Sequence, residues 1–102
     1  MTPKPVRLHP AALAEAEAAF AWYCERSESA AGRFLDELDW AIAGISQQPE
    51  IYPPFEAGTR RIRLPHFPYL VIFRAVGDSL EVIAVAHGRR RPGYWRQRLT
   101  KD

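Results

Sequence analysis

The sequence predicts an α+β domain in which an antiparallel pair of helices packs on a small, mainly antiparallel sheet of three to four strands. Apolar residues recur at helical spacing in two segments between residues 10 and 48. Three runs of β-branched and aromatic residues, separated by turn signals, follow between residues 59 and 87. A chain of 102 residues with 47% hydrophobic residues can build one core, so we expect a single domain over residues 1–102.

The N-terminal elements are a short strand and a first helix. We expect the strand over residues 5–8, and Pro10 suits the first position of a helix because its missing N–H would be unpaired there. The helix runs to about Arg26. Its predicted apolar stripe is Leu13, Ala16, Phe20, Tyr23 and Cys24, and the acidic residues Glu15, Glu17 and Glu25 fall mostly on other faces.

A second helix follows after a short polar break. Ser29 is the expected N-cap, and the helix must end near Gln48 because the residue before Pro49 is pushed out of the α region. So short a break predicts that the two helices are antiparallel. The predicted stripe of the second helix is Phe34, Leu35, Leu38, Ala41, Ile42 and Ile45.

Two tryptophans do not fit these stripes. Trp22 and Trp40 lie away from the centre of the apolar face of their helices, so we expect both to be partly exposed. A wide helix interface or a neighbouring loop could cover them. The alternative is that they form a docking patch for another protein.

The second half of the chain begins with an irregular connector over residues 49–58, which holds three prolines and a glycine. Residues 59–64 alternate as a strand does, with Arg61 and Arg63 on one face. After a turn, residues 69–76 and 80–87 are expected to form a hairpin around Gly77-Asp78.

The hairpin turn predicts which residues face each other. Arg74 is expected opposite Glu81, Ile72 opposite Ile83 and Leu70 opposite Val85. This parity places His87 on the face of Arg74, where Arg61 and Arg63 join it on the side that the helices leave uncovered. The opposite, helix-covered face is predicted to hold Tyr69, Val71, Phe73, Val82, Ala84 and Ala86. A short C-terminal helix is expected from Pro92, although Gly93 weakens it.

Charge is divided unevenly along the chain. Residues 1–58 hold four cations against nine acids, a balance of −5, whereas residues 59–102 hold ten cations against three acids, a balance of +7. Such asymmetry favours a polyanion or an acidic partner for the second half. The alternative is that the arginines pair with the acidic helices across the fold.

The single cysteine, Cys24, excludes an intramolecular disulfide, and its place on the stripe predicts a buried, inert thiol. The longest apolar runs are far shorter than the roughly 20 residues that span a bilayer, so we expect a cytoplasmic protein without a membrane segment. His9, His66 and His87 are not spaced as metal ligands, and no phosphate or dinucleotide loop occurs; neither metal nor cofactor is expected.

One constellation could carry chemistry. Cleavage of an RNA phosphodiester needs proton transfer, for which His87 and Tyr94 are candidates, and cations that stabilise the phosphorane, for which Arg61, Arg63, Arg74 and Arg90 are candidates. Binding without catalysis would use cations against phosphates and aromatic rings for stacking. The candidate binding residues are Arg60, Arg61, Arg63, Arg89, Arg90, Arg91 and Trp95. For Trp95 the favoured alternative is a core anchor of the C-terminal tail. Residue types alone do not separate catalysis from binding.

Three motifs carry a family resemblance. Ile51-Tyr-Pro-Pro54, Phe67-Pro-Tyr69 and Val85-Ala-His-Gly-Arg-Arg90, in this order of elements, resemble the RelE/ParE superfamily of bacterial toxins from type II toxin–antitoxin modules. The resemblance implies a toxin that a cognate antitoxin neutralises in a hetero-oligomer by wrapping its helices and sheet, and Trp22 and Trp40 are the candidate antitoxin contacts.

The resemblance also implies two classes of target. RelE-like members cleave mRNA on the ribosome without a metal, whereas ParE-like members poison DNA gyrase. The connector and the strand that ends at His87 are nearer to ParE-like proteins, and no lysine lies between Lys4 and Lys101, unlike in the lysine-dependent nucleases. We therefore expect a ParE-like toxin. A ribosome-dependent mRNA endonuclease and a non-toxic nucleic-acid-binding domain of the same fold are the alternatives.

Overall fold

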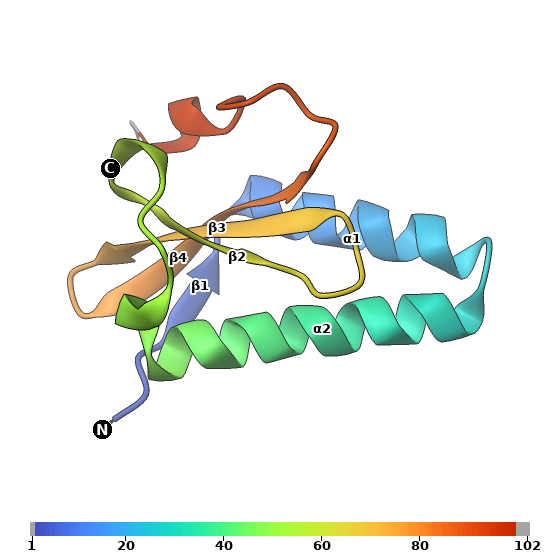
Figure 1. Ribbon diagram of the computed structural model, residues 1–102, viewed down its shortest axis with the longest axis horizontal. Coiled ribbons are helices and arrows are strands. Elements are labelled where there is room, and N and C mark those ends of the chain that lie inside the picture. The colour runs from blue at the N-terminus through green and yellow to red at the C-terminus, as the bar shows by residue number, and fades with distance from the viewer. Residues whose placement is uncertain (1, 100–102) are drawn as a thin grey trace.

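In the computed structural model, which describes residues 2–99, two helices pack against one face of a four-stranded sheet (Figure 1). The elements are β1 (Val6–Leu8), α1 (Pro10–Cys24), α2 (Glu28–Gln47), β2 (Arg60–Arg63), β3 (Tyr69–Val76) and β4 (Ser79–His87), with 3₁₀ turns at Pro49–Ile51, Glu56–Gly58 and Arg96–Leu99. The strand order is β1-β4-β3-β2, and only the β1–β4 pair is parallel. The predicted α+β class, with a helical hairpin on a mainly antiparallel sheet, is confirmed.

The two helices begin at side-chain caps. His9 Nδ1 accepts a hydrogen bond from the Ala11 N–H at 3.0 Å at the start of α1, with Pro10 in the first position as predicted. Ser27 caps α2, and its Oγ accepts from the Ala30 N–H at 3.2 Å. The prediction of Ser29 as the cap is wrong, because Ser27 has the extended backbone that an N-cap needs.

The buried face of α1 is made of small residues. Ala12, Ala16 and Ala19 are buried, whereas Leu13 is 48% exposed and Cys24 is exposed. The predictions that Leu13 and Cys24 lie on the buried stripe are wrong because three alanines, not the larger apolar residues, define the side that packs on β4. Their small side chains leave room for the helix to approach the sheet.

The buried face of α2 agrees better with the sequence. Phe34, Leu38, Ala41 and Ile45 are buried as predicted, although Leu35 is 40% exposed. Phe34 packs edge-on against Phe67 and Tyr69 at centroid distances of 5.5 Å, and this cluster joins the helix to the sheet.

A β-bulge in β4 changes the register that the turn predicted. The Gly77-Asp78 turn and the Arg74–Glu81 pair are confirmed, but Phe73 pairs with Val82 and Ile72 pairs with Ala84, so Ile83 is an extra residue. The predicted Ile72–Ile83 and Leu70–Val85 pairs are therefore wrong. Leu70 pairs with Ala86 instead.

The extra residue reverses the side on which later side chains of β4 lie, because successive side chains of a strand point to opposite faces. Val85 packs in the cluster under the helices, while Ala84 and Ala86 lie in a second cluster on the other face, contrary to the prediction. His87, opposite Tyr69, therefore lies on the helix side and not on the face of Arg74.

The face of the sheet opposite the helices, which we expected to be uncovered, is partly covered. Trp95 is 2% exposed there and packs with Ile72, Ile83 and Phe55. The predicted short C-terminal helix is present as a 3₁₀ turn, but this turn begins at Arg96 and not at Pro92. Gly93 has a positive φ of 76°, and the C-terminal segment ends in the 3₁₀ turn Arg96–Leu99.

Candidate functional site

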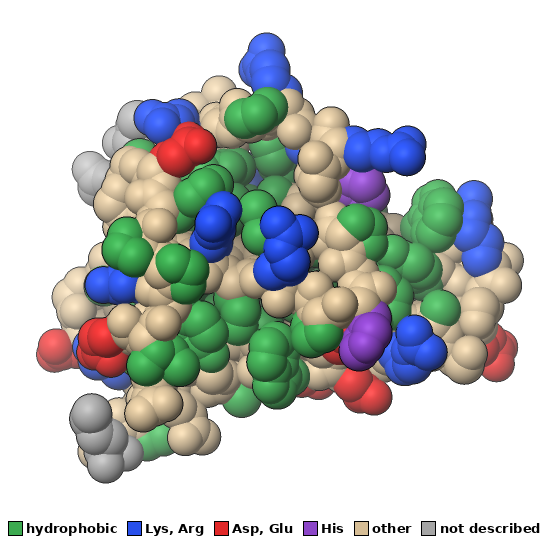
Figure 2. All heavy atoms as spheres, viewed as in Figure 1, with side chains coloured by type: hydrophobic (Ala, Val, Ile, Leu, Met, Phe, Trp, Pro, Cys, Tyr) green, Lys and Arg blue, Asp and Glu red, His purple; other side chains and the backbone are tan. Residues whose placement is uncertain are grey.

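The arginines of the second half do not form one cluster. Arg61 pairs with Ile72 and Arg63 with Leu70, so both lie on the face of Arg74, as predicted. Arg89 and Arg90 follow β4 at one end of the sheet and line a groove with His87. Figure 2 shows basic side chains standing apart from one another over the middle and the margin of the viewed face.

Some of these arginines are bound within the fold. Arg74 Nη2 lies 3.2 Å from Glu81 Oε1, and Arg74 Nη1 donates to the Leu99 carbonyl at 3.3 Å. Arg60 donates to the Tyr52 carbonyl. Arg60 was a candidate for target contact and Arg74 a catalytic candidate, and each of them has an internal partner.

Other arginines remain available for contact with a partner molecule. Arg63, Arg89 and Arg91 are exposed, and within residues 2–99 none of these three makes an ion pair or a side-chain hydrogen bond. The Arg61 guanidinium lies 4.9 Å from the ring centroid of Phe55, and that of Arg90 lies 3.8 Å from the ring centroid of Tyr94. Stacking orients these two guanidinium groups, and within residues 2–99 neither of them makes an ion pair.

His87 lies at the end of β4, directly before the basic segment of residues 89–91. Its Nδ1 accepts a hydrogen bond from the Arg89 N–H at 3.0 Å, and its ring meets Tyr69 edge-on at 5.1 Å. Because Nδ1 is an acceptor, the neutral ring carries its proton on Nε2.

A groove of about 750 Å³ separates the C-terminal half of α1 from the end of β4. Ala18, Ala19 and Val85 contribute apolar surface, while Trp22, His87, Tyr69, Arg89 and Arg90 contribute aromatic and basic surface. The Arg26 guanidinium lies 3.7 Å from the Trp22 ring centroid. The groove therefore combines aromatic and cationic groups beside apolar surface.

The predicted exposure of the two helical tryptophans is confirmed. Trp22 is 52% exposed and Trp40 is 53% exposed. Trp22 lines the groove, whereas Trp40, on α2, does not. Trp95 is buried, which confirms the core anchor and is contrary to the stacking surface, because a buried ring cannot offer its face to a ligand.

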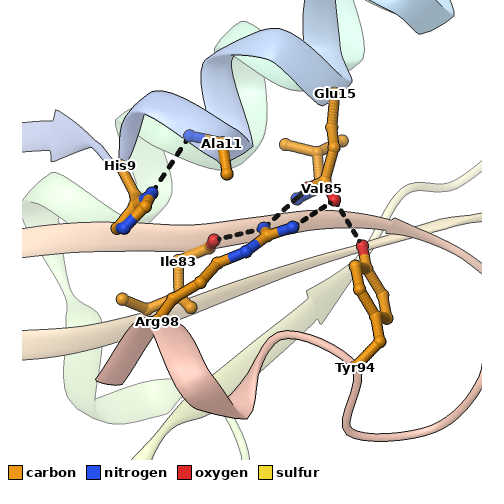
Figure 3. A network of polar contacts seen from close by, with 7 residues as sticks. All are labelled: His9, Ala11, Glu15, Ile83, Val85, Tyr94 and Arg98. Atoms are coloured by element: carbon orange, nitrogen blue, oxygen red, sulfur yellow. Dashed lines mark hydrogen bonds and ion pairs between the residues drawn. The ribbon is translucent and has the colours of Figure 1, made fainter. Parts of the chain in front are cut away.

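Sequence reasoning missed the polar network that ties the C-terminal segment to α1 (Figure 3). Glu15 accepts hydrogen bonds from the Tyr94 hydroxyl at 2.7 Å and from the Val85 N–H at 2.9 Å. Arg98 lies 2.9 Å from the same carboxylate and also donates to the Ile83 carbonyl at 2.9 Å. The available signal was that Glu15 stands directly beside Ala12, Ala16 and Ala19 on the helix.

The network fixes the protonation states of its members. Burial favours the neutral form of Glu15, but hydrogen bonds from Arg98, Tyr94 and Val85 and the charge of Arg98 outweigh it and lower its pKa. Burial, followed by the hydrogen bond to Glu15 and its charge, raises the pKa of Tyr94 far above the ordinary value. Tyr94 is thus a neutral hydrogen-bond donor to Glu15, an arrangement that opposes its use as a base.

The described part of the chain holds neither a metal-ligand cluster nor a membrane-spanning helix. Residues 2–99 contain no group of three His, Cys, Asp or Glu side chains arranged to hold a metal ion. Over the same residues, neither helix combines the length and apolar character needed to cross a membrane.

The fold and this surface define a small α+β protein with a basic, aromatic groove suited to a macromolecular partner. The family model described as "ParE toxin of type II toxin-antitoxin system, parDE" matches residues 6–92. The chain belongs to this ParE toxin family, which confirms the resemblance seen in its motifs.

Known relatives agree with this assignment. The chain is 28% identical to Toxin ParE2 of Mycobacterium tuberculosis, in both the CDC 1551 and the H37Rv strain. The aligned region has 75 residues and covers 72% of this chain and 71% of the relative. The solved structure titled "Chromosomal ParDE TA system from P. aeruginosa" matches with a TM-score of 0.73 at 17% identity, over 82% of this chain and 95% of that chain. The structural match shows a shared fold.

Proposed function

We propose that this ParE-family toxin inhibits bacterial growth in the cytoplasm by binding DNA gyrase, and that a cognate antitoxin neutralises it. The observation that carries the proposal is the set of exposed arginines without internal partners, Arg63, Arg89 and Arg91. Exposed cations speed association with an acidic or nucleic-acid-bound target and orient its approach.

Binding suits the geometry better than RNA cleavage does. The bulge separates His87 from the face that carries Arg61, Arg63 and Arg74. The Tyr94 hydroxyl, the other candidate for proton transfer, is bound to Glu15. A metal-independent nuclease would need these groups to converge on one phosphate.

The antitoxin is proposed to cover the exposed aromatic surface of the helices. Trp22 lies at the groove beside Arg89 and Arg90, where an acidic segment of a partner would find both charge and apolar contact. Trp40 is equally exposed on α2, and large exposed aromatic side chains are frequent anchors of protein interfaces.

Induced expression in bacteria tests the proposed target. We expect growth arrest, loss of gyrase supercoiling activity when purified toxin is added, and unchanged mRNA 5′ ends. New mRNA ends that disappear with His87→Ala would support the nuclease instead. Unimpaired growth would support a non-toxic binding domain of the same fold.

A charge variant tests the surface itself. The double substitution Arg89→Ala with Arg91→Ala should slow association with gyrase by about ten-fold at low ionic strength, because two steering charges are lost. Arg7→Ala with Arg33→Ala is the matched control, since it also removes two exposed cations and leaves residues 89–91 unchanged. Equal loss in both variants would show that net charge matters and that the position of residues 89–91 does not.

A further inference from the structure

We infer that Glu15 is a positioning residue, and that its carboxylate holds the basic segment of residues 89–91 in place by joining the edge of β4 to the C-terminal segment. The consequence for toxicity rests on the proposed function. The positioning itself is a property of the folded chain and can be measured without any activity.

The inference begins at the edge of β4. β1 ends at Leu8 and pairs only with residues 80–82, so in the described part of the chain no strand lies on this side of residues 83–87. Side chains bind two backbone groups there instead. Glu15 accepts from the Val85 N–H, and Arg98 donates to the Ile83 carbonyl, both at 2.9 Å. The Glu15–Arg98 pair therefore stands where a further residue of β1 would have been.

The same carboxylate holds the C-terminal segment. Glu15 Oε2 accepts from the Tyr94 hydroxyl at 2.7 Å and from Arg98 Nη2 at 2.9 Å, and Glu15 Oε1 accepts from Arg98 Nη1 at 3.1 Å. The side chains of Arg98 and Glu15 are only 13% and 15% exposed. Hydrogen bonds to a charged group shielded in this way are stronger than those at an open surface.

The restraint reaches the cations through Tyr94, whose ring packs beneath the Arg90 guanidinium at 3.8 Å. At the other end of the loop, His87 accepts hydrogen bonds from the backbone N–H groups of Arg89 and Arg90, both at 3.0 Å. The loop that carries residues 89–91 is thus held at two ends. The His87 end is local to the loop, and the Tyr94 end depends on Glu15.

Hydrogen–deuterium exchange on the purified 102-residue chain tests the positioning. In Glu15→Gln, amides of residues 89–99 should exchange about ten-fold faster, because the charge that gathers the three donors is gone. Amides of α2 and β3 should keep their wild-type rates. Glu17→Gln, which removes an exposed carboxylate from the same helix, should match wild type throughout.

Two results of this experiment would overturn the inference. Unchanged exchange in residues 89–99 would show that Glu15 restrains nothing there. A uniform increase that includes α2 and β3 would show that Glu15 supports the whole fold and does not act on one segment.

Tyr94→Phe separates the two routes from Glu15 into the segment. It keeps the ring beneath Arg90 and leaves the Glu15–Arg98 ion pair, but it removes the hydroxyl donor. We expect a smaller increase in exchange than in Glu15→Gln. An increase larger than that of Glu15→Gln would place the control of the segment at Tyr94 and overturn the assignment to Glu15.

Inhibition of gyrase supercoiling is the second measurement. Glu15→Gln should need roughly ten-fold more toxin to give the same inhibition of supercoiling, as a displaced basic segment loses its steering geometry. Faster exchange of residues 89–99 together with full inhibition of supercoiling by Glu15→Gln would overturn the link between positioning and toxicity. A wild-type toxin without effect on gyrase would overturn the proposed function, and the exchange result would stand by itself.

Discussion

At the scale of single residues, Glu15 shows how one charge can serve several elements. A carboxylate that is 15% exposed is costly to bury unless its hydrogen bonds are satisfied. Here a guanidinium, a phenol and a backbone N–H meet it, from the C-terminal segment and from β4. The charged form is therefore the one that the folded protein prefers.

This preference predicts a dependence of stability on pH. The pKa of Glu15 is lower in the folded protein than its ordinary value, so its contribution is present at neutral pH and is lost as pH falls through the folded pKa. Arg98, Tyr94 and Arg90 are the charged or titratable groups that face it or its partners. Glu15→Gln should cost roughly 1.5–3 kcal/mol at pH 7.

Urea denaturation at pH 7 and at pH 3 measures this dependence. The difference in the free energy of unfolding between wild type and Glu15→Gln should shrink at the lower pH, because the charged fraction of the Glu15 carboxylate in the folded chain falls with pH. Glu17→Gln serves as the control because its side chain is exposed. A difference that stays constant between the two pH values would contradict the assigned charge state.

Residue-level predictions succeeded where a large apolar side chain defined the buried face. Phe34 and Ile45 were placed correctly, but Leu13 and Cys24 were not, because the alanines that form the buried side of α1 contribute little to a hydrophobic pattern. Glu15 was missed for a different reason. Its partners Tyr94 and Arg98 are distant in the chain, so no local spacing connects them.

At the scale of elements, the hairpin was predictable and its bulge was not. The glycine in the Gly77-Asp78 turn and the β-branched runs on both sides fix the turn and the length of β3. Residues 82–86 are all apolar and all buried, with one face under the helices and the other under Trp95. Both sets of alternate residues in this run are wholly apolar, so no polar residue in the sequence marks where the extra residue lies.

The two glycines of α2 provide a prediction at this scale. A Cβ at Gly44 would overlap the Tyr52 hydroxyl, whereas a Cβ at Gly32 would meet nothing within 4 Å. Tyr52 packs edge-on against Phe73 at 6.0 Å, so Gly44→Ala would push a ring of the connector away from the core.

Chemical denaturation of the two variants measures the difference. We expect Gly44→Ala to destabilise the protein by about 1–3 kcal/mol through overpacking. Gly32→Ala should stabilise it by about 0.5–1 kcal/mol, because alanine restricts the unfolded chain and favours the helix. If both substitutions stabilised the protein equally, the connector would not depend on close contact with α2.

At the scale of the whole molecule, the uneven charge of the sequence is only partly neutralised by folding. Arg98 pairs with Glu15 of α1, and Arg96 lies 2.9 Å from Glu56 of the connector. Arg63, Arg89 and Arg91 have no such partner within residues 2–99. Of the two sequence interpretations, pairing across the fold therefore describes some arginines and an open basic surface describes others.

The surfaces around Trp22 and Trp40 give the last prediction, which concerns the proposed antitoxin. Both rings are about half exposed, whereas Trp95 is 2% exposed and provides an internal fluorescence reference. Burial of an indole ring shifts its emission to shorter wavelength, so the emission should shift when the antitoxin binds.

Trp22→Phe and Trp40→Phe separate the two fluorescence reporters. A shift that persists in Trp40→Phe and is absent in Trp22→Phe would confine the antitoxin to the groove beside α1, since only Trp22 lines it. Shifts in both variants would extend the interface across both helices, and no shift in either would contradict the aromatic docking surface.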